Sequence, residues 1–184
     1  MLDLAVNVLR FAAPVCLGAL GETVQQKSGV INIGLEGMML TAAFASLLGA
    51  EWSGNPWIGL AVGILAAVLV GSVQGLFVLA FAMDQVVVGT VINLFAVGIT
   101  STLFRMLFGA SGQLISVPKL PVLPLGLDVF LIAIPLAALG LAWVFSRSKW
   151  GLAVRAAGEN PKAVSAAGFS PLALRWQALV IGAL

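Results

Sequence analysis

The chain has 184 residues, of which 61% are hydrophobic and 9% are charged, and its formal net charge is +2. Soluble domains carry about 25% charged residues, so the apolar excess of this chain must face a medium other than water, most simply the lipid bilayer. The mean hydropathy of +1.12 agrees with this interpretation. The composition therefore excludes a soluble enzyme, a nucleic-acid-binding protein and a disordered scaffold.

Missing residue types narrow the chemistry further. The chain has no histidine, no tyrosine and a single cysteine, Cys16. These absences exclude a disulfide within the chain, a zinc site built on His and Cys, and Ser-His-Asp or Cys-His catalysis. The carboxylates are scattered, and no two are close enough in sequence to suggest an acid–base pair. We therefore expect no catalytic residue, no metal and no cofactor.

Six apolar runs predict an all-α integral membrane protein, because about 20 consecutive apolar residues cross a bilayer as a helix. The predicted spans form one bundle over residues 1–184, and they cover residues 4–21, 31–50, 57–82, 86–108, 127–146 and 172–184. The last run is too short to cross the membrane. We therefore expect the chain to stop inside a helix, either because it is truncated relative to a longer protein or because its terminal segment is abnormal.

Basic residues mark the cytoplasmic side of a membrane protein. Residues 147–175 hold five basic residues against one acid, Glu159, which predicts that a loop over residues 147–171 is cytoplasmic. Counting the spans backwards places Lys27 inside and the N-terminus outside. Arg105 and Lys119 disagree mildly with this orientation, because both would lie near the outer face.

A carboxylate and an amide lie among glycines in residues 28–40, at the start of the second predicted span. A charged side chain in mid-membrane costs about 2.5–3.5 kcal/mol, and broken helices occur where they are buried in protein or line a cavity. We predict a broken or re-entrant helix here, with Asn32 and Glu36 beside a translocation path or a moving joint. The alternative places Glu36 at the interface, near a helix N-terminus whose dipole favours an acid.

Two further amides, Gln74 and Asn93, lie within the long apolar spans. An amide is costly to expose to lipid, so each side chain needs a polar partner. They are candidates to line a pathway for a hydrogen-bonding solute. Hydrogen bonding between helices is an equal or better explanation for each amide taken singly.

The predicted cytoplasmic loop is longer than a connector needs and carries signals for the start and end of a helix. Asn160 can cap a helix that has Pro161 in its first turn, and Gly168 can end it. These signals predict a short helix over residues 162–167. They favour a docking element for a partner protein over the alternative, a solvated loop closed by a turn.

Three sequence motifs follow one another along the chain. They read N-I-G-L-E-G-M-M at residues 32–39, D-Q-V-V-V-G-T-V-I-N-L at 84–94 and R-A-A-G-E-N-P-K-A-V-S-A-A-G at 155–168. Together they resemble the permease subunits of ABC importers in the branched-chain amino acid, ribose and nucleoside group, and most closely its nucleoside and simple-sugar branch. Asp84 stands where the family pattern has Asn, and Val164 stands where it has a second Ala.

The resemblance implies a permease domain in the plasma (inner) membrane of a prokaryote, with several spans, that imports a nucleoside or simple sugar. It implies a second permease subunit in a homodimer or heterodimer, cytoplasmic ATP-binding subunits and an extracytoplasmic solute-binding lipoprotein. The chain has no G-x-x-x-x-G-K-[ST] phosphate loop, which agrees with ATP hydrolysis by the partner subunits.

The resemblance also assigns roles to residues. It makes the segment around the short helix the contact with the ATPase, through Arg155, Gly158, Glu159, Asn160, Pro161, Ala163 and Gly168. The candidates for the translocation path or its moving wall are Asn32, Glu36, Gln74 and Asn93.

Two other functions stay open at this stage. An ATP-independent secondary carrier or channel for a small polar solute has the same apolar composition. A structural membrane protein without a transport role has it too. The segment at residues 155–168 separates these functions from an importer, because only an importer needs it for contact with an ATPase.

Overall fold

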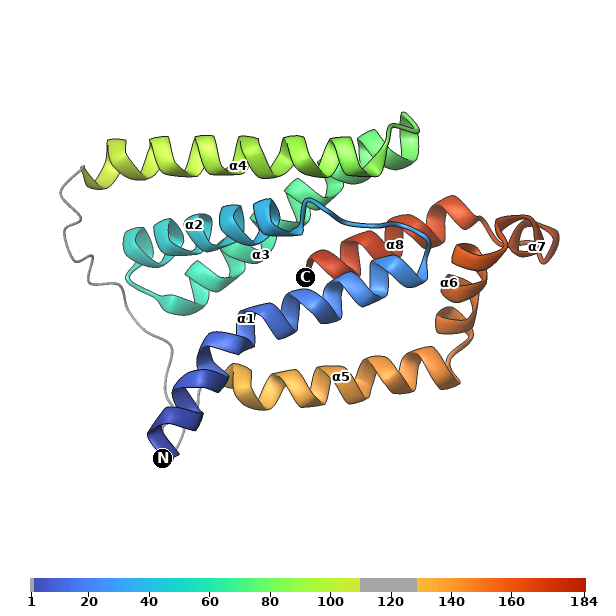
Figure 1. Ribbon diagram of the computed structural model, residues 1–184, viewed down its shortest axis with the longest axis horizontal. Helices are drawn as coiled ribbons and strands as arrows, with labels where there is room; N and C mark the ends of the chain where they lie inside the picture. Colours follow the sequence, from blue (N-terminus) through green and yellow to red (C-terminus); the bar gives the residue numbers. More distant parts are fainter. Residues whose placement is uncertain (1, 110–128) are drawn as a thin grey trace. The chain divides into compact units, whose positions relative to one another are not determined.

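The computed structural model describes residues 2–109 and 129–184, and within this part the chain is built from helices (Figure 1). The elements in chain order are α1 (Leu2–Lys27), α2 (Leu35–Ser53), α3 (Pro56–Gly75), the π-helix η1 (Leu76–Ala80), α4 (Gln85–Phe108), α5 (Val129–Arg147), α6 (Lys149–Glu159), α7 (Pro161–Ala166) and α8 (Pro171–Ala183). They form two compact units. We call the unit of α1 and α5–α8 the terminal unit, and the unit of α2–α4 the central unit.

The described residues include two helices that are long and apolar enough to cross a membrane, Pro56–Ala80 and Gln85–Phe108. They correspond to the predicted spans 57–82 and 86–108. A third span results if the bent pair Leu131–Arg147 and Lys149–Glu159, with an angle of 78°, counts as one. The predicted spans 4–21, 31–50 and 172–184 fall on α1, α2 and α8, and their crossing of the membrane stays a prediction. Lys119 and the first two residues of the predicted span 127–146 lie outside the described residues.

The predicted break near residues 28–40 lies at residues 28–34, between α1 and α2. Gly29 has a φ of +85°, and the amides of Gly29 and Val30 donate to the carbonyls of Gln26 and Gln25. This pattern is a Schellman motif, which ends a helix at a left-handed glycine. From Leu35 onwards α2 is continuous, so the second predicted span begins four residues later than the expected residue 31.

The predicted loop 147–171 is largely helical, because residues 149–159 form α6. The hydroxyl of Ser148 caps the helix and accepts a hydrogen bond of 2.9 Å from the amide of Gly151. Val154 and Ala157, three residues apart, bury one side of α6. The charged residues, alanines and glycines of this segment are also typical of a loop in sequence.

The central unit is held by close packing of α2 on α3 and by contacts of α2 with α4. An added Cβ on Gly59 would lie 2.6 Å from the Cβ of Ala50 and 2.7 Å from the carbonyl oxygen of Ser46, so the two backbones approach closely. The N-cap of α4 is Asp84, whose carboxylate accepts from the amides of the second and third helical residues at 2.8 and 3.1 Å. Asp and Asn are both strong N-caps, which accounts for Asp84 at a position where the family pattern has Asn.

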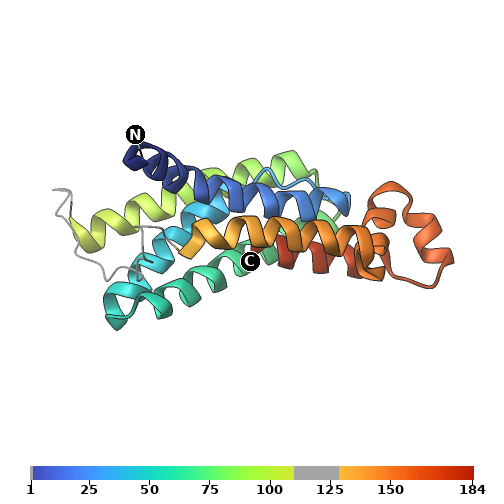
Figure 2. The same cartoon turned by 90° about the horizontal axis from the view of Figure 1, so that it is seen from below.

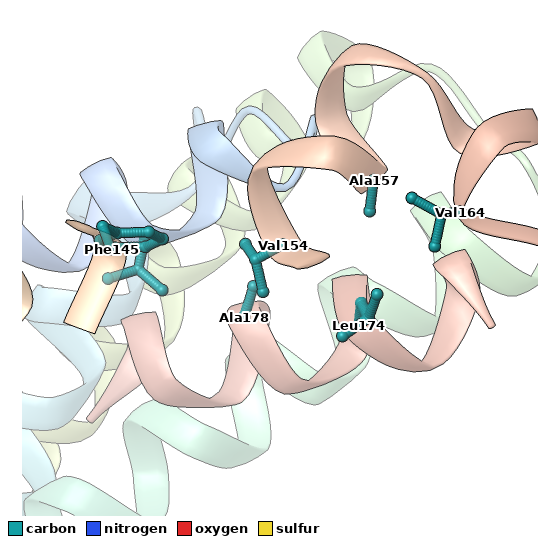
Figure 3. Close-up of a cluster of buried hydrophobic side chains, with 7 residues drawn as sticks. Phe145, Val154, Ala157, Val164, Leu174 and Ala178 are labelled. Atoms are coloured by element: carbon teal, nitrogen blue, oxygen red, sulfur yellow. The ribbon is translucent and has the colours of Figure 1, made fainter. Parts of the chain in front are cut away.

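The core of the terminal unit is a cluster of buried apolar side chains from all five of its helices (Figure 3). Its members are Val24, Phe145, Val154, Ala157, Val164, Leu174 and Ala178. The cluster joins α6 and α7 to the ends of α1, α5 and α8. Within this unit α7 projects beyond the ends of α1 and α5 in both views (Figures 1 and 2).

Candidate functional site

The short helix predicted at residues 162–167 is confirmed as α7, Pro161–Ala166. The side-chain oxygen of Asn160 accepts a hydrogen bond of 3.2 Å from the amide of Ala163. The helix ends at Gly168, whose φ is +85°, and the amides of Gly168 and Phe169 donate to the carbonyls of Ser165 and Val164. Local sequence signals at both ends therefore fix this helix.

One buried side chain attaches α7 to the rest of the unit. Val164 is 4% exposed and belongs to the buried cluster, while the residues on both sides of it are exposed. The exposed surface consists of small and polar side chains, followed by Phe169, which is 57% exposed. We call residues 159–170 the coupling surface, after the role that the resemblance implies for them.

The structure divides the residues proposed to contact the ATPase into two groups. Glu159, Asn160, Ala163 and Gly168 are exposed on the coupling surface, and Pro161 is partly exposed there. Gly158 instead faces the end of α1, where an added Cβ would lie 2.5 Å from the carbonyl oxygen of Lys27 and 3.0 Å from the amide nitrogen of Gly29.

Arg155 is partly buried on α6. Its Nε atom has no hydrogen-bond partner within residues 2–109 and 129–184. Leaving a buried guanidinium donor unpaired is costly.

The sequence analysis did not predict a structural role for Arg175, which it counted only as a basic residue on the cytoplasmic side. Its guanidinium donates from Nε to the carbonyl oxygen of Ser28 at 3.2 Å and from Nη2 to that of Ala157 at 3.3 Å. One signal could have found it, because Arg175 is the single charged residue in the apolar stretch 171–184.

In the central unit, Asn93 joins α4 to the start of α2. Its amide oxygen accepts a hydrogen bond of 2.7 Å from the backbone of Gly37, and its amide nitrogen donates to the carbonyl oxygen of Ile33 at 2.9 Å. The Gly37 amide is one of the N-terminal donors of α2 that have no partner within the helix. Gln85 also binds the segment that precedes α2, because its side-chain oxygen accepts a hydrogen bond of 2.6 Å from the amide of Ile31.

Three of the four predicted path residues are brought together around residues 31–37, and we call Asn32, Gln74 and Asn93 the polar cluster. Asn32 is 4% exposed, and an added Cβ on Gly34 would lie 3.4 Å from its side-chain oxygen and 2.8 Å from that of Gln74. Gln74 is fully buried, and neither atom of its amide has a hydrogen-bond partner in the described part of the chain.

The fourth predicted path residue, Glu36, does not join the polar cluster. It is exposed in the first turn of α2, where the partial positive charge of the helix N-terminus favours a carboxylate. A groove of about 430 Å³ in the central unit lies elsewhere on α2 and α4, and none of the four predicted residues lines it. Its walls are Leu40, Ala43, Phe44, Leu47, Thr100, Ser101, Phe104 and Arg105.

No group of three or more His, Cys, Asp or Glu side chains that could hold a metal ion occurs among the described residues. The donors that the structure does gather are amides and backbone groups. Such groups suit hydrogen bonding to an uncharged polar molecule.

Comparison with known proteins places the chain in a transport context. Residues 4–184 match the family model described as "Branched-chain amino acid transport system / permease component". The guanosine ABC transporter permease protein NupQ of Bacillus subtilis is 31% identical over 96% of this chain and 62% of its own length. The nucleoside ABC transporter permease protein NupC of Lactococcus lactis is 29% identical over 97% of this chain and 62% of its own length.

A third relative, the provisionally named glucose ABC transporter permease protein TsgC13 of Haloferax volcanii, is 28% identical over 93% of this chain and 56% of its own length. The chain thus spans less than two thirds of the length of these relatives. No solved structure matches it.

Proposed function

This chain belongs to the family of permease components of branched-chain amino acid transport systems, and we propose that it is the membrane-spanning permease part of an ABC importer. It moves a nucleoside or simple sugar across the plasma membrane of a prokaryote. The observation that carries this proposal is the family match over residues 4–184, with relatives named for guanosine, nucleosides and glucose.

The chemistry of the polar cluster supports an uncharged, hydrogen-bonding solute. Its side chains are amides, each of which can both donate to and accept from a sugar hydroxyl or a nucleobase edge. Asn32 and Gln74 are buried, and the amide of Gln74 is unpaired within the described residues. Asn32, Gln74 and Asn93 line the translocation path or its moving wall, and Glu36 contributes from the start of α2.

The coupling surface supports contact with partner ATP-binding subunits. It projects from the terminal unit, and Val164 fixes it to the buried cluster, so force on α7 reaches the helices behind it. Glu159, Asn160, Ala163 and Gly168 touch the ATPase directly. A second permease subunit and an extracytoplasmic solute-binding lipoprotein complete the importer.

Uptake of labelled solutes tests the proposed function. Cells carrying the permease gene with its partner genes are expected to accumulate a labelled nucleoside or sugar, and cells without the permease gene are not. Uptake should stop when the phosphate-loop lysine of the ATP-binding subunit is replaced. Uptake that persists in that variant would identify an ATP-independent carrier, and a lack of any nucleoside or sugar uptake would contradict the substrate class.

Glu159→Lys is expected to reduce ATP-driven uptake at least roughly fivefold, on the scale of a coupling free energy between two sites. Glu159 is exposed on the coupling surface, so the change removes a contact with the ATPase without disturbing the core. Uptake and the amount of subunit in the membrane are measured together. The matched control is Glu51→Lys, the same charge reversal at an exposed residue of α2. Equal uptake by both variants would contradict the coupling role.

Gln74→Leu is expected to leave the thermal stability of the purified subunit unchanged or to raise it, while uptake falls. Burial of an amide without a partner costs about 1–3 kcal/mol, and leucine removes that cost. The matched control is Gln85→Leu, which removes the acceptor of the Ile31 amide and should lower stability. Normal uptake by Gln74→Leu would show that this amide is not needed in the path.

A further inference from the structure

The backbones of α1 and α6 touch directly at their C-terminal ends. An added Cβ on Gly29 would lie 3.1 Å from the Cα of Gly158, and one on Gly158 would lie 2.5 Å from the carbonyl oxygen of Lys27. Two glycines therefore meet with no side chain between them. Such a contact transmits displacement efficiently, because no flexible group can absorb it.

The guanidinium of Arg175 spans the same junction. It donates to the carbonyl oxygen of Ser28, just past the end of α1, and to that of Ala157, in the last turn of α6. The C-terminal end of a helix carries partial negative charge, so one cation stabilises both helix ends at once. We call Arg175 with the Gly29–Gly158 contact the helix clip.

A second set of contacts joins α1 to α8, the helix that carries Arg175. An added Cβ on Gly182 would lie 2.6 Å from the carbonyl oxygen of Gly21, so these two backbones are also close. Between this contact and the clip, the buried side chain of Gln25 donates to the carbonyl oxygen of Leu179 at 3.3 Å. These two contacts hold α1 and α8 together at two positions along their length.

The clip lies directly behind the coupling surface. Gly158 is followed by Glu159, the last residue of α6, and Asn160 then caps α7. A partner that moves α7 must therefore also move the end of α6, and the clip passes this displacement to α1 and α8.

We propose that Arg175 is a positioning residue that transmits movement of the coupling surface to α1, through its paired bonds to Ser28 and Ala157. This inference rests on the proposed importer function and adds the element that links ATPase contact to the transmembrane helices. Arginine suits this role better than lysine, because its planar group presents several donors in a fixed geometry while lysine acts as a point charge.

The test uses the complete importer with its partner subunits in proteoliposomes, and it measures ATP hydrolysis and solute uptake in the same preparation. Arg175→Gln is expected to retain ATP hydrolysis while the solute imported per ATP falls roughly fivefold or more, as for loss of a coupling free energy. Arg175→Lys should give an intermediate ratio, and it carries the test if Arg175→Gln does not assemble. Arg147→Gln removes the same charge from an exposed position at the end of α5 and should leave the ratio unchanged.

An unchanged ratio of uptake to ATP hydrolysis in Arg175→Gln would overturn the inference. So would uptake and hydrolysis that fall together with the amount of folded complex in both Arg175→Gln and Arg175→Lys, because that result indicates a structural role alone. Absence of ATP-driven uptake by the unmodified importer would overturn the proposed function itself, and the role of the clip with it.

Discussion

Replacing Gly158 with alanine is expected to destabilise the subunit and to abolish most ATP-driven uptake. The new methyl group would meet the carbonyl oxygen of Lys27 at 2.5 Å and the amide nitrogen of Gly29 at 3.0 Å, and both are backbone atoms that cannot rotate away. Overpacking of this kind costs about 1–3 kcal/mol. The ends of α1 and α6 must separate to accept it, which breaks the contact through which α7 acts on α1.

Gly140→Ala is the matched control for this experiment. Gly140 lies in α5 of the same unit, and an added Cβ there would meet no atom within 4 Å. Alanine is the better helix former by about 0.5–1 kcal/mol, so the control should be neutral or stabilising. Thermal stability of the purified subunit and uptake by cells are measured for both variants. Full uptake by Gly158→Ala would show that the contact between α1 and α6 is not needed.

Asn93→Leu is expected to lower stability by about 1–3 kcal/mol, because the buried Gly37 amide loses its acceptor. The carbonyl oxygen of Ile33 loses its donor at the same time. The turn over residues 31–34 is then released from α4, and the polar cluster loses its geometry. Uptake should fall with a change in KM, because the cluster is proposed to contact the solute.

Asn93→Asp separates the two roles of this residue. A carboxylate still accepts from the Gly37 amide, close to the N-terminus of α2, but it cannot donate to Ile33. Stability should therefore recover in part, and uptake should stay low if the amide meets the solute. Thr102→Val is the control on the same helix, since its hydroxyl donates to the carbonyl oxygen of Gly98 in α4 itself. An Asn93→Asp variant with normal KM would assign Asn93 a purely structural function.

Sequence signals predicted those elements that depend on interactions between residues close together in the sequence. Asn160 and Gly168 lie at the two ends of α7, and the bonds that begin and end this helix join residues no more than five positions apart. The spans at Pro56–Ala80 and Gln85–Phe108 were also predictable, because an uncharged apolar run of that length has few alternatives to a membrane helix.

The helix α6 was not predictable in the same way. Its charged ends and its glycines are also typical of loops, and its buried side needs the cluster of the terminal unit to be stable. A helix of this length is marginal in isolation, so tertiary packing decides its conformation. The sequence could not supply that information until α5 and α8 were placed around it.

The sequence by itself determined that the chain is a helical membrane protein, where its most apolar helices run and where α7 begins and ends. Only the tertiary structure decided what the polar residues do. Asn93 reaches Gly37 across 56 positions, and Arg175 reaches Ser28 across 147. The physical reason is that composition indicates which medium surrounds the chain, and periodicity indicates the local backbone conformation. The partner of a buried polar group depends instead on which helices pack together.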